Sequence, residues 1–208
     1  MKLSQFTLPQ FSAETAADKA VPGGGCVAAL SGNLGASLIE MVGHMTERKA
    51  RKLGEAFDAE VQKALEIATK EKEAFLQLID QDAAAFDGCM QAFALPKATE
   101  EEKAVRKAAI QKAYQNATVP PYTVATKAVE LMECARIMVL KGDQNALSDA
   151  CVGTRMLVSA AWGGIYNVKI NLSAITDEAF VAKKSEEVAA LEARLETYTH
   201  DILDHVSF

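Results

Sequence analysis

Aromatic side chains are scarce in this chain of 208 residues: they make up 6% of it, and Trp162 is the single tryptophan. Proline is scarce as well, with five residues in the whole chain. Strands favour aromatic and β-branched residues, whereas helices favour alanine and exclude proline, so this composition favours close-packed helices over a sheet. Half of the residues are hydrophobic, which suffices for a sizeable core and argues against disorder.

Cysteine and histidine are too few and too scattered to predict a zinc site. The cysteines include no Cys-x-x-Cys pair, and the histidines complete no cluster of metal ligands. Widely spaced thiols are typical of a reducing compartment, so we expect a cytoplasmic protein. The cysteines are Cys26, Cys89, Cys134 and Cys151, and the histidines are His44, His200 and His205.

Positive charge is also in deficit. The net charge is −6 and the isoelectric point is near 5.2, which argues against a general nucleic-acid binder because such proteins carry a surplus of lysine and arginine. The first residues lack the apolar core of a signal peptide, and no uncharged apolar run reaches the length of a bilayer span. We therefore expect neither nucleic acid nor a membrane as a partner.

The most informative segment that is present is a run of three glycines, Gly23, Gly24 and Gly25, between Pro22 and Cys26. Glycine loses more backbone freedom on folding than any other residue, so three in a row need a reason. They precede a predicted helix, whose free backbone N–H groups can bind an anion. The alternative is a turn that only lets this helix pack closely, and the segment alone does not decide between the two.

The rest of the chain repeats its apolar residues at steps of three and four, which predicts helices throughout. The helix after the glycines ends in the basic segment 47–52, and Gly32, Gly35 and Gly43 within it allow another backbone or a ligand to approach closely. The sequence predicts one all-α domain over residues 1–208, a bundle of long helices with a glycine-rich turn near its N-terminus. Further helices are predicted at 55–90, 99–119, 122–141, 146–161 and 177–205, with an interruption at Gly163 and Gly164.

Asp82 is the polar residue whose surroundings are most unusual. It lies among alanines and phenylalanines, one turn from the predicted core residue Ile79. A carboxylate that is partly buried costs free energy unless it is paired or catalytic, and the alternative is that Asp82 faces solvent. No Ser/His/Asp set, P-loop or dinucleotide fingerprint accompanies it.

Other polar residues are weaker candidates. Asp149 stands where a loop enters a helix, a place at which a capping role is commoner than a binding role. Asn167 and Asn171 lie among apolar residues, where amides hydrogen-bond a loop backbone or read a polar heterocycle. Lys97 follows a proline in a bend and is therefore the basic residue best placed for a ligand.

Taken together, these segments resemble the cyclodeaminase/cyclohydrolase family, which contains the C-terminal domain of formiminotransferase-cyclodeaminase. The resemblance extends over nearly the whole chain, from about Phe6 to Phe180. Cys26 departs from the family pattern, which has a serine after the glycines, and a thiol is a weaker hydrogen-bond partner than a hydroxyl. The matching segments are 22–25, 41–46, 80–86, 95–103, 148–150 and 167–172.

This resemblance implies an all-helical homodimer that acts on one-carbon units bound to tetrahydrofolate, without a tightly bound cofactor. In the cyclodeaminase reaction, N10 of 5-formiminotetrahydrofolate attacks the formimino carbon, ammonia leaves, and 5,10-methenyltetrahydrofolate results. The catalytic aspartate of the family falls on Asp82, and a separate formiminotransferase is a candidate partner. Candidate substrate-binding residues for the pterin or the glutamate tail are Gly23, Gly24, Gly25, Cys26, Lys97, Asp149, Asn167 and Asn171.

Two other functions compete with the cyclodeaminase. The first is methenyltetrahydrofolate cyclohydrolase, in which water attacks the methenyl carbon and 10-formyltetrahydrofolate forms. Segments 41–46 and 175–180 look more like the cyclodeaminase branch. The second is a helical scaffold or dimerisation domain without activity, which Cys26 favours and which the glycine run and Asp82 argue against.

Overall fold

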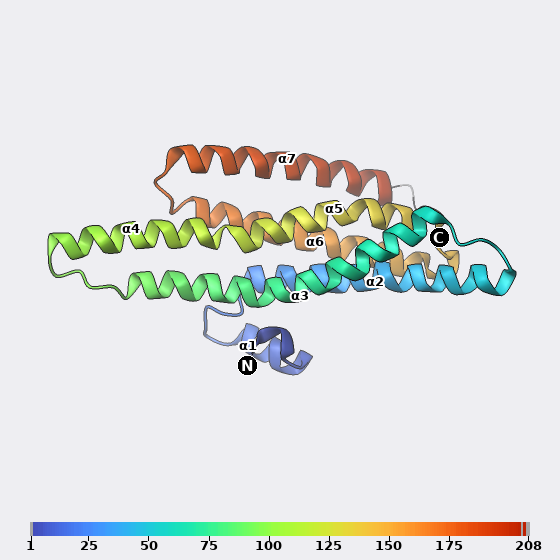
Figure 1. The fold of residues 1–208 in the computed structure, drawn as a ribbon, viewed down its shortest axis with the longest axis horizontal. Coiled ribbons are helices and arrows are strands. Elements are labelled where there is room, and N and C mark those ends of the chain that lie inside the picture. The colour runs from blue at the N-terminus through green and yellow to red at the C-terminus, as the bar shows by residue number, and fades with distance from the viewer. Residues whose placement is uncertain (1, 205, 207–208) are drawn as a thin grey trace.

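The fold is known from a computed structural model, which describes residues 2–204 and residue 206. All regular elements within these residues are helices, which confirms the predicted all-α class. They form an elongated bundle, in which α3 and α4 extend together beyond the other helices (Figure 1). The elements are η1 (Leu3–Gln5), α1 (Leu8–Ala16), α2 (Gly24–Leu53), α3 (Ala59–Phe93), α4 (Glu100–Ala117), α5 (Val119–Lys141), η2 (Gln144–Ala146), α6 (Leu147–Leu172) and α7 (Glu178–Leu203).

Helix α2 occupies the centre of the bundle. It packs along both α3 and α6, while α5 packs against α6 and α3, and α7 covers α5 and α6. Fully buried side chains such as Ile39, Phe75, Leu131 and Leu157 come from α2, α3, α5 and α6, so the core lies between these four helices. By length and composition alone α2 could also cross a membrane, with a mean hydropathy of 1.4 over its most apolar window, but 61% of that window is buried inside the bundle.

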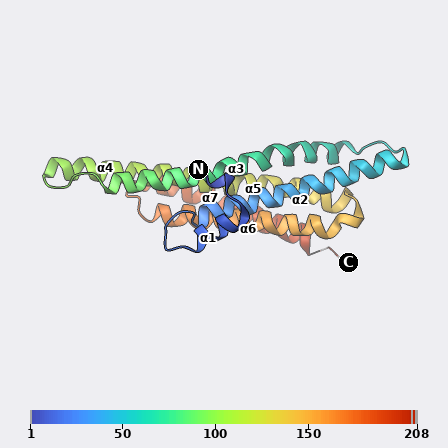
Figure 2. The ribbon, with the colours of Figure 1, turned by 90° about the horizontal axis from the view of Figure 1, so that it is seen from below.

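The N-terminal segment lies outside the bundle, as Figures 1 and 2 show from two sides. It is attached to α3 through Ser4, whose backbone N–H and hydroxyl donate to the carboxylate of Asp80 at 3.2 and 2.6 Å. Thr7 caps α1 with a capping box that includes Gln10. The sequence analysis missed α1, because nine residues with one buried side chain, Phe11, carry little periodic signal.

Small residues let the central helices approach closely. A Cβ atom on Gly35 would lie 3.0 Å from the backbone oxygen of Gly153, and one on Gly32 would overlap the ring of Phe75 at 2.5 Å. A Cβ on Gly43 would meet the side chains of Leu65 and Met138 at 3.0 Å. The close approach predicted from the glycines of α2 is therefore confirmed.

The predicted interruption at Gly163 and Gly164 is wrong, because α6 runs through both glycines without a break. Tertiary packing explains their presence: a Cβ atom on Gly164 would lie 2.5 Å from the backbone oxygen of Pro121 and 2.9 Å from the backbone nitrogen of Ala125. The two glycines mark a contact between helices. The backbone hydrogen bonds of α6 continue through them because a glycine weakens a helix by only about 1 kcal/mol.

Smaller differences concern helix ends. Helix α5 begins at Val119 and holds Pro120 and Pro121 in its first turn, where the missing N–H is no loss. Helix α3 continues to Phe93, three residues beyond the predicted end. Helix α7 ends at Leu203, and His205, the predicted end of this helix, lies outside the described residues.

Two glycine substitutions should have opposite effects on stability. We expect Gly164→Ala to lower the free energy of unfolding by about 1–3 kcal/mol, because the new methyl group overlaps backbone atoms of α5. Gly88→Ala should raise it by about 0.5–1 kcal/mol, because this site in α3 has no atom within 4 Å of the new Cβ and alanine favours the helix. Urea denaturation measures both. Equal changes in the free energy of unfolding would contradict the conclusion that Gly164 is required by the close contact of α6 with α5.

Candidate active site

One cavity of about 280 Å³ contains most of the residues that the sequence singled out. It lies where the N-terminus of α2 meets α3, α4 and α6, next to the segment that joins α1 to α2. Asp82 is its only charged lining residue among those described. The lining consists of Ala20, Val21, Gly23, Gly24, Gly25, Asp82, Ala85, Phe86, Cys89, Met90, Phe93, Tyr114, Ala117, Asn167, Ile170 and Asn171.

The carboxylate of Asp82 lies directly against the N-terminus of α2. Its Oδ2 accepts a hydrogen bond from the thiol of Cys26, with Sγ at 3.2 Å, and the carboxylate also accepts one from the backbone N–H of Cys26. Gly25 makes this possible, because a Cβ atom at that position would overlap the carboxylate. The glycine run thus does precede a helix, and the anion at that helix N-terminus is the protein's own aspartate.

Burial raises the pKa of Asp82, and the hydrogen bonds from the thiol and backbone N–H of Cys26 oppose this rise without cancelling it. Burial, followed by the nearby charge of Asp82, raises the pKa of Cys26 to about 12. Cys26 is therefore a neutral thiol that donates to Asp82, rather than a reactive thiolate. Asp82 is suited to holding and releasing a proton, or to stabilising a cation in the cavity.

The two asparagines of α6 lie on the same wall of the cavity, one turn apart. The amide N–H of Asn167 donates to the backbone oxygen of Gly163, and that of Asn171 donates to the backbone oxygen of Ala117, both at 2.8 Å. Because a backbone oxygen only accepts, these contacts fix the orientation of both amides. Among the described residues, the oxygen and the second N–H of each amide have no protein partner, so the wall can both accept from and donate to a ligand.

The apolar side of the cavity was missed by the sequence analysis. Phe86, Met90 and Phe93 follow Asp82 at steps of four, four and three residues, so they share its face of α3. Tyr114 of α4 and Ile170 of α6 complete this side. Phe86 has the helical spacing of a core residue, but it is 36% exposed at the cavity. The three- and four-residue spacing from Asp82 could have indicated these residues, but the residues of a helix that face a core have the same spacing.

Two predicted residues lie away from the cavity. Lys97 is exposed in the connection 94–99 between α3 and α4. Asp149 is in the first turn of α6, 18 residues before Asn167, which corresponds to about 27 Å along the helix. Neither Ser148 nor Asp149 caps α6, whose N-cap is Ala146. Within the described part of the chain, no group of three or more His, Cys, Asp or Glu residues is placed to hold a metal ion.

The fold and the site define a class of protein: a helical bundle with a half-buried carboxylate at a glycine-rich helix entrance. Comparisons with known proteins identify the family. The family described as formiminotransferase-cyclodeaminase matches residues 7–190. The chain belongs to this family, as the resemblance predicted.

Individual relatives differ in their named activities. Methenyltetrahydrofolate cyclohydrolase of Methylorubrum extorquens is 34% identical over 90% of this chain and 89% of its own. Formimidoyltransferase-cyclodeaminase of Gallus gallus is 36% identical over 83% of this chain, and the match spans about a third of that longer protein, 31%. The crystal structure of formiminotetrahydrofolate cyclodeaminase from Thermotoga maritima has the same fold, with a TM-score of 0.81, 24% identity and 98% coverage of both chains.

Asp82→Asn should stabilise the protein at neutral pH, because it removes a buried charge. The pKa of Asp82 is higher in the folded state than in the unfolded state. Its contribution to stability therefore falls as the pH rises from the ordinary aspartate pKa of 3.8 through the folded pKa. We expect the variant to gain about 1 kcal/mol at pH 7 and to lose this advantage near pH 4. Urea denaturation at both pH values measures it.

Asp87→Asn is the matched control, because Asp87 is exposed on the same helix. It should show no such pH-dependent difference from the wild type. An Asp82→Asn protein that is less stable than the wild type at pH 7 would contradict the assignment of a raised pKa.

Proposed function

We propose that this protein is a formiminotetrahydrofolate cyclodeaminase, which converts 5-formiminotetrahydrofolate to 5,10-methenyltetrahydrofolate and ammonia. The observation that carries the proposal is the half-buried carboxylate of Asp82, held at a cavity wall by the N-terminus of α2. Membership of the family and the names of its relatives support a folate substrate.

Asp82 has two tasks in this reaction. N10 attacks the formimino carbon and loses its proton, and the C–N bond to the departing amine breaks after that amine gains a proton. Asp82 accepts the first proton and returns it to the leaving group, so the carboxylate is regenerated. The raised pKa of Asp82 suits this transfer, because the best proton carriers have a pKa near the working pH. The negative charge also stabilises the cationic amidine and the cationic methenyl product.

The remaining cavity residues bind the substrate. The amide oxygens of Asn167 and Asn171 accept from N–H groups on the pterin edge, and Gly23 and Gly24 line the cavity at the helix entrance beside them. Cys26 acts on Asp82 through its thiol hydrogen bond rather than on the ligand. Lys97 and Asp149 remain candidate contacts for the tail or for a second subunit, since neither lines this cavity.

Methenyltetrahydrofolate cyclohydrolase is the second candidate. It is favoured by the relative from Methylorubrum extorquens, whose length this chain matches almost completely. Water would replace N10 as the nucleophile, and Asp82 would take the proton from that water. Both reactions pass through a tetrahedral carbon between N5 and N10, so the same cavity serves either one.

Turnover of two substrates tests the proposal. Purified protein is mixed with 5-formiminotetrahydrofolate or with 5,10-methenyltetrahydrofolate, and the near-ultraviolet band of the methenyl form is followed together with ammonia. A cyclodeaminase increases the band and releases ammonia in the first mixture. A decrease only in the second mixture would make the protein a cyclohydrolase, and no change in either would favour the scaffold alternative.

Asp82→Asn should lower kcat by about 10²-fold or more with the substrate that the wild type turns over, because an amide cannot accept and return the transferred proton. Asp87→Asn, on the same helix but exposed, should retain wild-type turnover. Unchanged turnover by the Asp82 variant would remove the assigned role.

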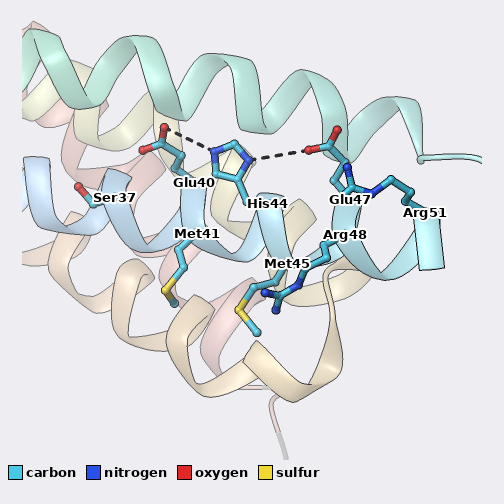
Figure 3. Close-up of a pocket in the computed structure, with 8 residues that line it drawn as sticks. All are labelled: Ser37, Glu40, Met41, His44, Met45, Glu47, Arg48 and Arg51. Carbon is cyan, nitrogen blue, oxygen red and sulfur yellow. Dashed lines mark ion pairs between the residues drawn. The ribbon is translucent and has the colours of Figure 1, made fainter. Parts of the chain in front are cut away.

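We also propose a homodimer that forms through the outer face of α2. Val27, Leu34 and Met41 recur at seven-residue steps on this face and are 37–41% exposed. Next to them lies an open hollow of about 630 Å³, whose lining comes entirely from α2. Figure 3 shows Met41 and Met45 on one side of the helix and Glu40, His44 and Glu47 on the other.

The order of this row suits a second copy of the same chain. Leu34 is its middle residue, so two antiparallel copies that cross at Leu34 place Val27 of one copy opposite Met41 of the other. A row of apolar residues at a seven-residue repeat is typical of a helix–helix seam.

Met41→Glu should therefore convert a dimer into a monomer of 22.3 kDa in light scattering, because the new charge would be buried at the seam. Val105→Glu, at an exposed apolar site on α4, is the control and should leave the mass unchanged. A wild-type protein of 22.3 kDa, or a dimeric Met41→Glu variant, would exclude this interface.

A further inference from the structure

The cavity at Asp82 is elongated along α3 and changes character along its length. Its α3 residues run from Asp82 to Phe93 on one helical face, eleven positions or about 16 Å apart. Hydrogen-bonding groups gather near Asp82, and large apolar side chains gather toward Phe93. A ligand that fills this cavity must be long, with its polar reactive part at one end.

An aromatic pair forms part of the far wall. The rings of Phe93 and Tyr114 meet edge to face, with centroids 6.1 Å apart and an angle of 84° between their planes. Both residues line the cavity. Such a pair presents apolar ring surfaces at right angles, against which a ligand's aromatic ring can pack face to face or edge to face.

Arg106 stands directly behind this wall. Its guanidinium carbon lies 5.6 Å from the centroid of the Phe93 ring, and its Nε and Nη2 donate to the backbone oxygen of Phe93 at 3.2 and 3.1 Å. Phe93 is the last residue of α3, where the helix dipole favours a cation. Arg106 is therefore fixed beside the cavity and is not a freely moving surface side chain.

The neighbouring acidic residues do not neutralise Arg106. Glu102, one turn earlier on α4, accepts from the backbone N–H groups of Ala98 and Thr99. Glu100 is paired with Lys103 at 2.7 Å. Two N–H groups of Arg106 are engaged by Phe93, and since a guanidinium has five, three remain for an anion.

We propose that Arg106 binds the glutamate carboxylates of the folate substrate, with the substrate's benzoyl ring against Phe93 and Tyr114. This inference rests on the proposed function, which places N5 and N10 at Asp82. From N10 to its carboxylates an extended p-aminobenzoylglutamate spans roughly 10–13 Å by ordinary bond lengths. That span agrees with a cavity whose two ends are Asp82 and the wall in front of Arg106.

Arginine is better suited to this task than Lys97. A guanidinium binds a carboxylate through two parallel hydrogen bonds and also stacks on aromatic rings, whereas an ammonium group does neither as well. Lys97 is exposed beyond the end of α3 and is not a lining residue of the cavity. Arg106 is half-buried and contacts a lining residue.

The test compares Arg106→Gln with Lys107→Gln. Each removes one positive charge from α4, but Lys107 is exposed and is the matched control. With the substrate of the turnover assay, Arg106→Gln should raise KM about tenfold while kcat changes little, and Lys107→Gln should leave both unchanged. With the dimethyl ester of the substrate, which has no carboxylate charge, wild type and Arg106→Gln should have equal KM.

A purely structural role of Arg106 would affect both substrates equally, so the ester separates the two. Arg106→Lys, which keeps the charge, should recover part of the lost affinity, and thermal melts verify that each variant folds. Equal KM for Arg106→Gln and Lys107→Gln would overturn the inference and leave the proposed reaction intact. If the wild type turned over neither substrate, the proposed function would fail. Binding of p-aminobenzoylglutamate would then test Arg106 separately, and equal affinity of the wild type and Arg106→Gln would overturn its role.

Discussion

The contact between the carboxylate of Asp82 and the N-terminus of α2 is the interaction on which the rest of the site depends. Asp82 and Cys26 are 56 positions apart in sequence, and only a residue without a side chain at Gly25 allows the carboxylate to reach the backbone N–H of Cys26. The helix N-terminus supplies hydrogen bonds and a favourable dipole, while burial works against ionisation. The balance leaves Asp82 with a raised pKa and a fixed orientation, and both properties suit proton transfer.

Close packing of the central helices keeps this contact in place. Gly35 and Gly153 bring α2 and α6 together, and Gly164 does the same for α6 and α5. The approach of α6 to α2 also brings Asn167 against Gly24, where a Cβ atom would lie 3.1 Å from the amide nitrogen. Small residues thus have two related roles, because the packing that holds the bundle together also closes the cavity.

The cavity separates its chemical groups along α3. Its lining among the described residues has a single charge, the acidic Asp82, and the cation Arg106 lies behind the aromatic wall. In the proposed reaction, the first end stabilises a cationic one-carbon unit and the second attracts an anionic tail. Because Arg106 is attached at Phe93, about 16 Å along α3 from Asp82, the arginine does not compete with the substrate for Asp82.

The sequence by itself determined the helical class, the helix entrance at the glycines and the unusual surroundings of Asp82, since each depends on neighbours within a few residues. Only the tertiary structure decided that Gly163 and Gly164 lie inside α6, because their reason is the backbone of α5, which no local pattern encodes. It likewise decided that Cys26 hydrogen-bonds Asp82, that Lys97 and Asp149 lie outside the cavity, and that Phe93 and Arg106 belong beside it. A spacing of three or four residues tells which side chains share a helix face, but which partner that face meets depends on how whole helices pack.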